Sequence, residues 1–149
     1  MVKLNLETQL ALIEFSYQHY LKQTLPLTPN KSFIKAFDEC PYPIASHTSE
    51  TVPKFNYANK AALDLFDVTW DALIGSPSRM SAPEANQIER ETLLSQVKSH
   101  GFIRQYKGIR QTHGGKKFLI EDATVWNIID HIGKIHGQAV IILRHNTHE

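Results

Sequence analysis

The sequence predicts an α+β fold: a five-stranded antiparallel sheet with short helices on one face and an amphipathic helix near the N-terminus. Three observations predict it. The stretch 102–143 contains three runs rich in Ile, Val, Phe, Tyr and Trp, separated by turn signals at 113–115 and 130–133, which is the pattern of a meander. Two shorter strand-like runs and several helical patterns precede it. A chain of 149 residues fits one domain, so a single sheet is the economical arrangement.

The first expected element is a helix within residues 4–25. Its apolar residues recur at spacings of three and four, which is the stripe of an amphipathic helix: Leu6, Leu10, Ile13, Tyr17 and Leu21. Pro26 and Pro29 end it. A short helix over 33–37 follows. We assign residues 1–40 to an N-terminal helical extension and residues 41–147 to the domain that contains the sheet.

The next elements are short. Strands are expected at 44–47 and 54–58, and Asn59 stands where an N-cap is needed for a helix over 60–66. Another helical turn, capped by Thr69, ends at Gly75. A longer helix over 83–100 ends at Gly101, and the meander then begins.

Composition limits the classes of partner. The chain has 16 basic and 15 acidic residues, a net charge of +1 and no run of like charges, so we expect no direct nucleic acid binding. Cys40 is the single cysteine, which excludes an internal disulfide framework, and we see no secretory leader. No apolar stretch approaches the ~18 residues of a membrane span. We therefore expect a cytoplasmic protein that does not enter a membrane.

Several blocks of residues resemble a known family. The segment 55–66 has the order of strand, Asn59 and helix that PAS domains have, and Gly75 matches their closing glycine. Turns at 115–118 and 130–133 match their two hairpin turns. Within PAS-like proteins the sequence is most similar to the MEKHLA family, through blocks at 55–62, 77–82, 101–103, 106–110, 118, 120–127 and 137–139. The resemblance implies a PAS-like MEKHLA domain over 41–147 with a sensing or interaction role, and no established reaction.

The resemblance also fixes which residues of the meander face the helices, because side chains alternate along a strand. The helix-facing set is expected to be Arg104, Tyr106, Gly108, Arg110, Leu119, Glu121, Ala123, Val125, Asn127, Gln138, Val140 and Ile142. The opposite set is Ile103, Ile109, Phe118, Ile120, Trp126, Ile128, Ile141 and Leu143. This second set is too apolar to face water. We expect the N-terminal helix to cover it, either within one chain or across a homodimer.

The helix-facing set is more polar than a plain core requires. The candidate ligand-binding residues are Arg79, Tyr106, Arg110, Glu121, Asn127 and Gln138. Buried polar groups need partners, so these side chains form either a closed internal network or the lining of a pocket for a small, partly polar ligand. The small residues Gly108 and Ala123 favour the pocket because they leave room.

The resemblance suggests one candidate cofactor, a flavin. The segment 75–80 is similar to the Gly-x-x-Cys-Arg-Phe motif of flavin-binding, light-sensing PAS domains, with Arg79 at the arginine that contacts the phosphate. Ser78 replaces the reactive cysteine, however, and a serine cannot form the thiol adduct. Glu121 and Ile142 stand where that subclass has amide side chains. We do not expect a flavin, and the identity of the ligand stays open.

Other chemistry has less support. The histidines, His47 among them, lie mostly near turns and strand ends without the paired spacing of a zinc site, so we expect surface histidines and no metal. The sequence also lacks a GxSxG motif and a glycine-rich phosphate loop. Glu121 and Asp122 point to opposite faces of a strand and cannot act together on one substrate.

Three functions follow, in order of preference. The first is a PAS-like sensor that binds a small molecule and acts through homodimerisation or a protein partner. The second is a protein-interaction domain with a filled core, which a closed interior around Glu121 would indicate. The third is a small enzyme, for which an open pocket containing Glu121 or Tyr106 and a perturbed pKa would be the sign. We expect no enzyme, because no complete set of acid, base and nucleophile is visible.

Overall fold

The computed structural model describes residues 5–147, and it contains the expected five-stranded antiparallel sheet in the order β2-β1-β5-β4-β3. The strands are β1 (Ile44–Thr48), β2 (Phe55–Ala58), β3 (Phe102–Gln111), β4 (Lys117–Ile129) and β5 (Ile135–Thr147). β1 pairs with both β2 and β5, so the last strand of the meander lies in the middle of the sheet. The predicted fold class is therefore confirmed.

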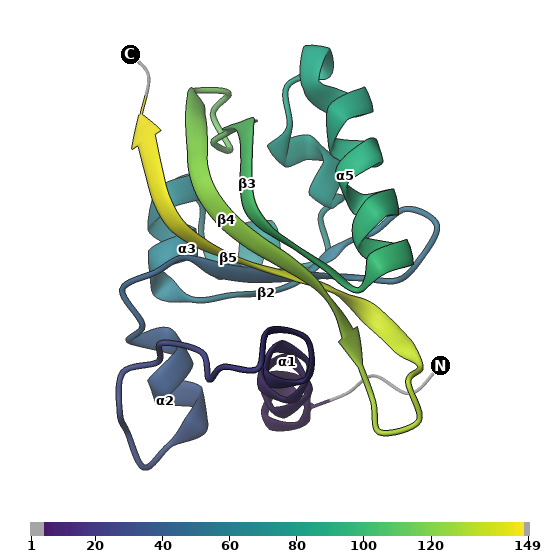
Figure 1. The fold of residues 1–149 in the computed structure, drawn as a ribbon. Coiled ribbons are helices and arrows are strands. Elements are labelled where there is room, and N and C mark those ends of the chain that lie inside the picture. Colours follow the sequence, from purple (N-terminus) through teal and green to yellow (C-terminus); the bar gives the residue numbers. More distant parts are fainter. Residues whose placement is uncertain (1–4, 148–149) are drawn as a thin grey trace.

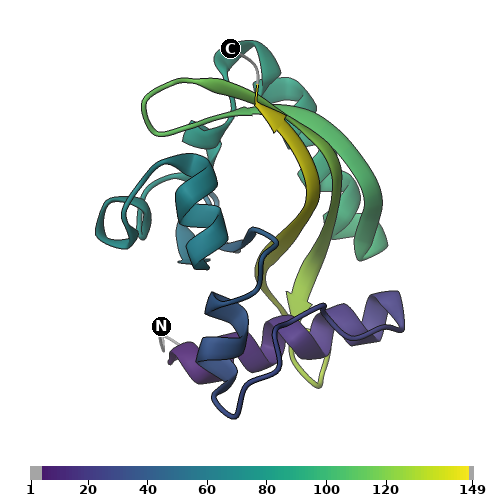
Figure 2. The same ribbon diagram turned by 90° about the vertical axis from the view of Figure 1, so that its left-hand side faces the viewer.

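Helices lie on both faces of this sheet. They are α1 (Leu6–Leu21), α2 (Phe33–Asp38), α3 (Lys60–Phe66), α4 (Trp70–Leu73) and α5 (Gln87–His100), with 3₁₀ turns η1 (Ser78–Ser81) and η2 (Glu84–Asn86). In the view of Figure 1, α1 and α2 lie below the sheet and α5 lies above it. Figure 2 shows that β4 and β5 curve strongly, with α1 and α2 together at one end of the curve.

Local sequence explains where two of the helices begin and end. The Asn5 side chain caps α1 by accepting from the Thr8 amide at 2.8 Å, and Lys22 ends the helix in a left-handed conformation, before the two prolines. The predicted helix over 83–100 is shorter than expected: residues 84–86 form the 3₁₀ turn η2, and α5 begins at Gln87. Gly101 ends α5 with φ at +99°, and a Cβ there would collide with the Tyr20 ring.

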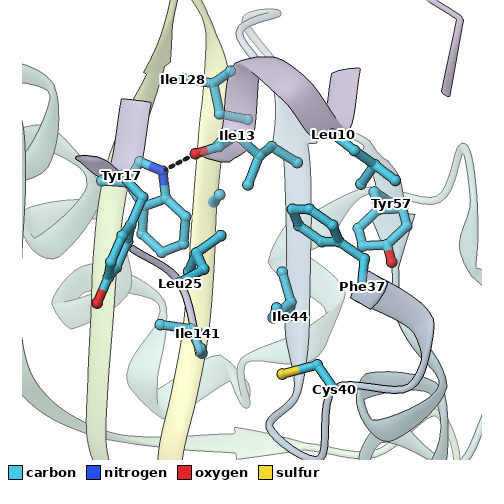
Figure 3. Packing of buried hydrophobic residues seen from close by; sticks show 12 residues of the cluster. Leu10, Ile13, Tyr17, Leu25, Phe37, Cys40, Ile44, Tyr57, Ile128 and Ile141 are labelled. Carbon is cyan, nitrogen blue, oxygen red and sulfur yellow. Dashed lines mark hydrogen bonds between the residues drawn. The ribbon is translucent and has the colours of Figure 1, made fainter. Parts of the chain in front are cut away.

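The N-terminal helix of the same chain covers the apolar face of the sheet. Figure 3 shows side chains of α1 and α2 pointing toward Ile44, Ile128 and Ile141 of the strands. Two hydrogen bonds fix the position of α1, since the Trp126 indole donates to the Ile13 carbonyl at 3.2 Å and the Ile129 amide donates to the Ser16 hydroxyl at 2.7 Å. This face is therefore closed within one chain and does not require a second copy.

Asn59 joins three segments of the chain: α3, β1 and the segment that precedes β1. It is fully buried, and its Oδ1 accepts from the amides of Ala62 and Ile44, both at 3.0 Å. Its Nδ2 donates to the carbonyls of Phe37 and Tyr42 at 3.0 and 2.9 Å. The predicted N-cap of α3 thus also holds the chain that precedes β1.

Irregular pairing of β4 corrects part of the predicted face assignment. The β4–β5 ladder is irregular between Ile120 and Ala123, which lets these two residues point to the same face although they are three apart. Phe118 and Ile120 therefore pack against α3 and not against α1. The prediction that Leu119 and Glu121 face the helices is wrong, because each alternates with Ile120.

The same effect appears in β3. Its pairing with β4 is irregular between Ile103 and Tyr106, where Gln105 has φ at +56°. Ile103 packs beside Leu93 and Val97 of α5 instead of lying on the opposite face, and Arg104 is exposed. Leu143, predicted to be covered by the N-terminal helix, is 39% exposed.

Candidate functional site

A partly open cavity of about 80 Å³ lies between the sheet, η1 and α5. Most of its wall is apolar, and includes Phe55, Phe66, Leu93, Ile120, Val140 and Ile142. Eight of the lining residues carry a charged, amide, imidazole, phenol or hydroxyl group: Ser46, His47, Ser78, Ser81, Arg90, Tyr106, Arg110 and Gln138. The site therefore combines an apolar space with a group of polar side chains, the usual composition of a small-molecule pocket.

Four of these side chains form a continuous hydrogen-bonded row. Arg90 Nη2 donates to Ser78 Oγ at 2.6 Å, and Ser78 Oγ lies 2.7 Å from His47 Nδ1. His47 Nε2 lies 3.0 Å from Gln138 Oε1. The row connects α5, η1, β1 and β5, so it joins four elements that are distant in the sequence.

Gln138 extends the row to a second strand and back to α5. Its Nε2 donates to the Leu94 carbonyl at 3.0 Å and to Asn127 Oδ1 at 3.2 Å. Asn127 Nδ2 donates in turn to the Val97 carbonyl at 3.0 Å. These contacts fix the amide orientation of Gln138, because its nitrogen serves two acceptors and leaves its oxygen toward His47.

The row also fixes the tautomer of His47. Gln138 Oε1 is an acceptor, so His47 Nε2 carries the hydrogen, and a neutral ring then accepts at Nδ1 from the Ser78 hydroxyl. Burial, opposed by the Gln138 hydrogen bond and aided by the charge of Arg90, lowers the pKa of His47 to about 4. The imidazole is therefore neutral at physiological pH, with both nitrogens engaged.

Arg90 is a buried cation without an acidic partner. It is 6% exposed, and no carboxylate of residues 5–147 lies within 4.0 Å of its guanidinium. Burial, then the neighbouring charge of Arg110, lowers its pKa to about 10, so it stays charged at neutral pH. Buried charges are normally paired. This one has an uncharged serine hydroxyl as its hydrogen-bond partner.

A second group lies at the α5 side of the cavity. The Tyr106 hydroxyl donates to Glu89 Oε1 and Oε2, at 2.6 and 2.8 Å, and Arg110 Nη1 lies 3.9 Å from Glu89 Oε1. Burial raises the pKa of Tyr106 to about 12, so the phenol is neutral. A Cβ at Gly108 would overlap the Tyr106 hydroxyl, so the room that this glycine leaves is occupied by that side chain.

The structure brings together three of the six predicted site residues at the cavity. Tyr106, Arg110 and Gln138 line it, and Asn127 lies directly behind, bonded to Gln138. Arg79 and Glu121 lie elsewhere. Arg79 is exposed on η1, since that turn directs its neighbour Ser78 inward. Glu121 lies on the outer face, 4.0 Å from Arg144, because of the irregularity in β4.

Sequence reasoning missed His47, Ser78 and Arg90 as members of the site. His47 was expected at the surface, yet period two places it on the same face of β1 as Ala45, which also lines the cavity. Arg90 precedes the core residues Leu93 and Val97 at helical spacing, which places it on the buried stripe of α5. These two signals were available in the sequence. The inward direction of Ser78 depends on a 3₁₀ turn that no local pattern indicates.

A flavin does not fit this interior. The volume of about 80 Å³ is small for a tricyclic ring system, since pockets for drug-sized ligands start near ~300 Å³. Ser78, at the position of the reactive cysteine in flavin-binding relatives, is already bonded to His47 and Arg90.

Two further properties concern metals and membranes. Within residues 5–147, no three His, Cys, Asp or Glu side chains gather closely enough to hold a metal ion. None of the helices in this part of the chain is long and apolar enough to cross a membrane.

The family model of the MEKHLA domain matches residues 7–147. No curated protein matches the sequence. Among solved structures, a PAS domain from Colwellia psychrerythraea is 17% identical, with a TM-score of 0.64 over 76% of this chain and 92% of that chain. The PAS domain of a LuxR-family transcriptional regulator from Burkholderia thailandensis, in complex with ethanol, is 18% identical, with a TM-score of 0.58 over 74% of this chain and 95% of that chain.

An RNA-binding light-oxygen-voltage receptor is also similar in structure. It is 13% identical, with a TM-score of 0.65, over 84% of this chain and 36% of the receptor. Identities this low establish the fold and nothing about ligands. The chain has a PAS-like fold related to that of PAS and light-oxygen-voltage sensor domains.

Proposed function

The chain belongs to the MEKHLA domain family, and from this we propose that it is a PAS-like sensor module that binds a small molecule in this cavity. The observation that carries the proposal is a cavity next to an ordered polar row that includes a buried, unpaired arginine. Protein cores are close-packed, so a space of about 80 Å³ beside fixed polar groups is better explained by a ligand than by a packing defect. The similar PAS domain from B. thailandensis was solved in complex with ethanol, a molecule small enough for a space of this size.

The cavity is placed so that its occupancy can affect distant surfaces. Val125 and Val140 line it, while their neighbours Trp126 and Ile141 point to the other face and pack against α1 and α2. The sheet is therefore the only layer between the ligand and these helices. A ligand acts as a signal when it favours one arrangement of the sheet and its helices over another.

We propose that the output is a homodimer or a partner protein. Met80 on η1 and Ile88 on α5 are large apolar side chains that are 59% and 81% exposed. Both belong to elements that also supply the polar row, so a partner that contacts them would be sensitive to the cavity. We propose no catalytic step.

An enzyme, the third of the functions considered, needs weighing because Ser78, His47 and Gln138 are arranged like a nucleophile, a base and an orienting residue. The pKa of about 4 makes His47 a weak base at neutral pH, and Arg90 already donates to the Ser78 oxygen. Tyr106 lines the cavity, but its raised pKa of about 12 weakens it as an acid. The arrangement therefore favours binding over turnover.

The test is native mass spectrometry on protein purified gently from its own host, combined with a cavity-filling variant. We expect a bound small molecule in the wild type and its loss in Val140→Phe, whose ring would fill the cavity. Leu143→Phe, exposed on the same strand, is the matched control and should keep the ligand. Light scattering with and without the ligand then measures the oligomeric state. An empty wild-type protein that Val140→Phe stabilises would support the interaction domain with a filled core instead.

A further inference from the structure

The charges around the cavity leave one positive charge unbalanced. Arg90 and Arg110 line the cavity, and Glu89 lies 3.9 Å from Arg110 but more than 4.0 Å from the Arg90 guanidinium. His47 and Tyr106, the other titratable residues in the lining, are neutral. The charge of Glu91 acts on Arg90 at longer range, but no carboxylate of residues 5–147 pairs with Arg90 directly, and a bound monoanion would be that direct partner.

The hydrogen-bonding groups at the wall are donors. Both ring nitrogens of His47, the Ser78 hydroxyl and both ends of the Gln138 amide are already engaged with protein partners. Within residues 5–147, Nη2 is the only Arg90 side-chain nitrogen that donates to a protein acceptor. The only fully enclosed side-chain polar atom without a partner in this part of the chain is Glu14 Oε2, so the remaining Arg90 N–H groups reach accessible space, and Arg90 lines the cavity. A ligand group facing them must be an acceptor.

The rest of the wall selects the remainder of the ligand. Phe55, Phe66 and Ile142 belong to the apolar part of the wall, so a short hydrocarbon chain would be buried against them favourably. A volume of about 80 Å³ has room for only a few carbon atoms, since a dry cavity of ~150 Å³ holds a benzene molecule. Phosphate lacks an apolar part and carries more than one negative charge near neutral pH, so it matches neither property.

We infer that the cavity binds a small aliphatic monocarboxylate of about two to four carbons, with its carboxylate on the free N–H groups of Arg90 and its chain among the apolar residues. This inference rests on the proposed function and specifies the chemistry of the ligand. A guanidinium that pairs with a carboxylate acquires the partner that the folded chain does not provide.

The test is titration calorimetry of the full chain in a carboxylate-free buffer at constant ionic strength. The probes are acetate, propionate and butyrate, with propionamide as a neutral analogue and phosphate as an inorganic anion. Affinities on the order of millimolar or tighter are expected for so few ligand atoms. Propionate should bind at least tenfold more tightly than propionamide, and Arg90→Gln should weaken propionate at least tenfold. Arg79→Gln removes an exposed arginine of the adjacent turn and should leave the affinity unchanged.

The outcomes separate this inference from the proposed function. Equal affinities for propionate and propionamide, or tighter binding of phosphate, would overturn the monocarboxylate assignment. This comparison uses the wild type, so it decides the question even where Arg90→Gln does not fold. If no probe binds while native mass spectrometry finds another molecule, the inference fails and the proposed function stands. If no molecule is found and Val140→Phe stabilises the fold, both fail.

Discussion

His47 makes the stability of this protein sensitive to acid, and the direction follows from its pKa. The folded-state pKa of about 4 lies below the ordinary value of 6.5, so the unfolded chain binds a proton more readily between these two values. We predict that the free energy of unfolding is fully maintained above pH 6.5 and decreases as the pH falls toward 4. The decrease is on the order of 3 kcal/mol, at about 1.4 kcal/mol for each pH unit. Urea denaturation at a series of pH values measures it.

His47→Gln is the control for this prediction, because an amide keeps hydrogen-bonding groups but does not titrate. The variant should be less stable at pH 7 and should lack the His47 contribution to the slope. Glu14 has the opposite effect on the pH dependence of stability, since burial raises its pKa. Both proteins contain Glu14, so subtracting the slope of the variant from that of the wild type removes its contribution. Equal slopes in both proteins would show that His47 is not buried in the neutral form.

Asn59 tests the buried amide that joins α3, β1 and the segment before it. Asn59→Asp keeps the acceptor for Ala62 and Ile44 but faces the carbonyls of Phe37 and Tyr42 with a second acceptor. We predict a loss of about 3 kcal/mol or more in unfolding free energy, because two buried acceptors lose their donor. Asn5→Asp is the matched change at an exposed N-cap and should stay within about 0.5 kcal/mol of wild type, since both residues cap well. Similar losses in both variants, measured by denaturation at pH 7, would contradict the role assigned to Asn59.

At the scale of elements, the sequence predicted the strands and helices well and the faces of the long strands less well. Hydrophobic runs, turn residues and caps are local signals, so the meander, the Asn59 cap and the helix ends near Leu21 and Gly101 could be predicted. The irregular pairing near Glu121 could not, because it arises from the fit between two curved strands. One such irregularity exchanges the two faces for every residue beyond it.

Glu121 and Ile120 give a direct test of the corrected faces. Glu121→Gln should change the unfolding free energy by less than about 0.5 kcal/mol, because the carboxylate is partly exposed and its ion pair with Arg144 is long. Ile120→Ala removes a buried side chain at the cavity wall and should cost about 2 to 5 kcal/mol. Thermal or urea unfolding of both variants measures the difference. If Glu121→Gln cost more unfolding free energy than Ile120→Ala, Glu121 would face the helices, as strand alternation first predicted.

The helix α1 is predicted to be necessary for a soluble domain. Deletion of residues 1–25 removes the cover from Trp126, Ile128 and Ile141, so the truncated protein should aggregate. Ile13→Ala is the milder change and should cost about 2 to 5 kcal/mol while the chain stays monodisperse. Light scattering distinguishes the two results. A truncated protein that remained soluble, with the mass of its monomer, would show that this face needs no cover.

At the scale of the whole molecule, the cavity could be anticipated but its lining could not be fully identified. Tyr106, Arg110 and Gln138 follow from strand alternation near the ends of the meander. The other three members of the polar row, His47, Ser78 and Arg90, come from β1, η1 and α5, and their convergence depends on the order in which the strands pair. A buried arginine at helical spacing with core leucine and valine is the signal that would have pointed to the site.

Trp126 gives the molecule an intrinsic optical readout of how α1 sits on the sheet. Its indole is fully buried, is hydrogen-bonded to Ile13 of α1 and packs edge-on against Tyr17, with ring centroids 5.0 Å apart. The second tryptophan, Trp70, is 37% exposed, so Trp70→Phe would leave Trp126 as the single tryptophan, in an apolar environment. Val125, the residue before Trp126, lines the cavity. A red shift of the emission on adding a ligand would therefore report release of the helix, without any attached label.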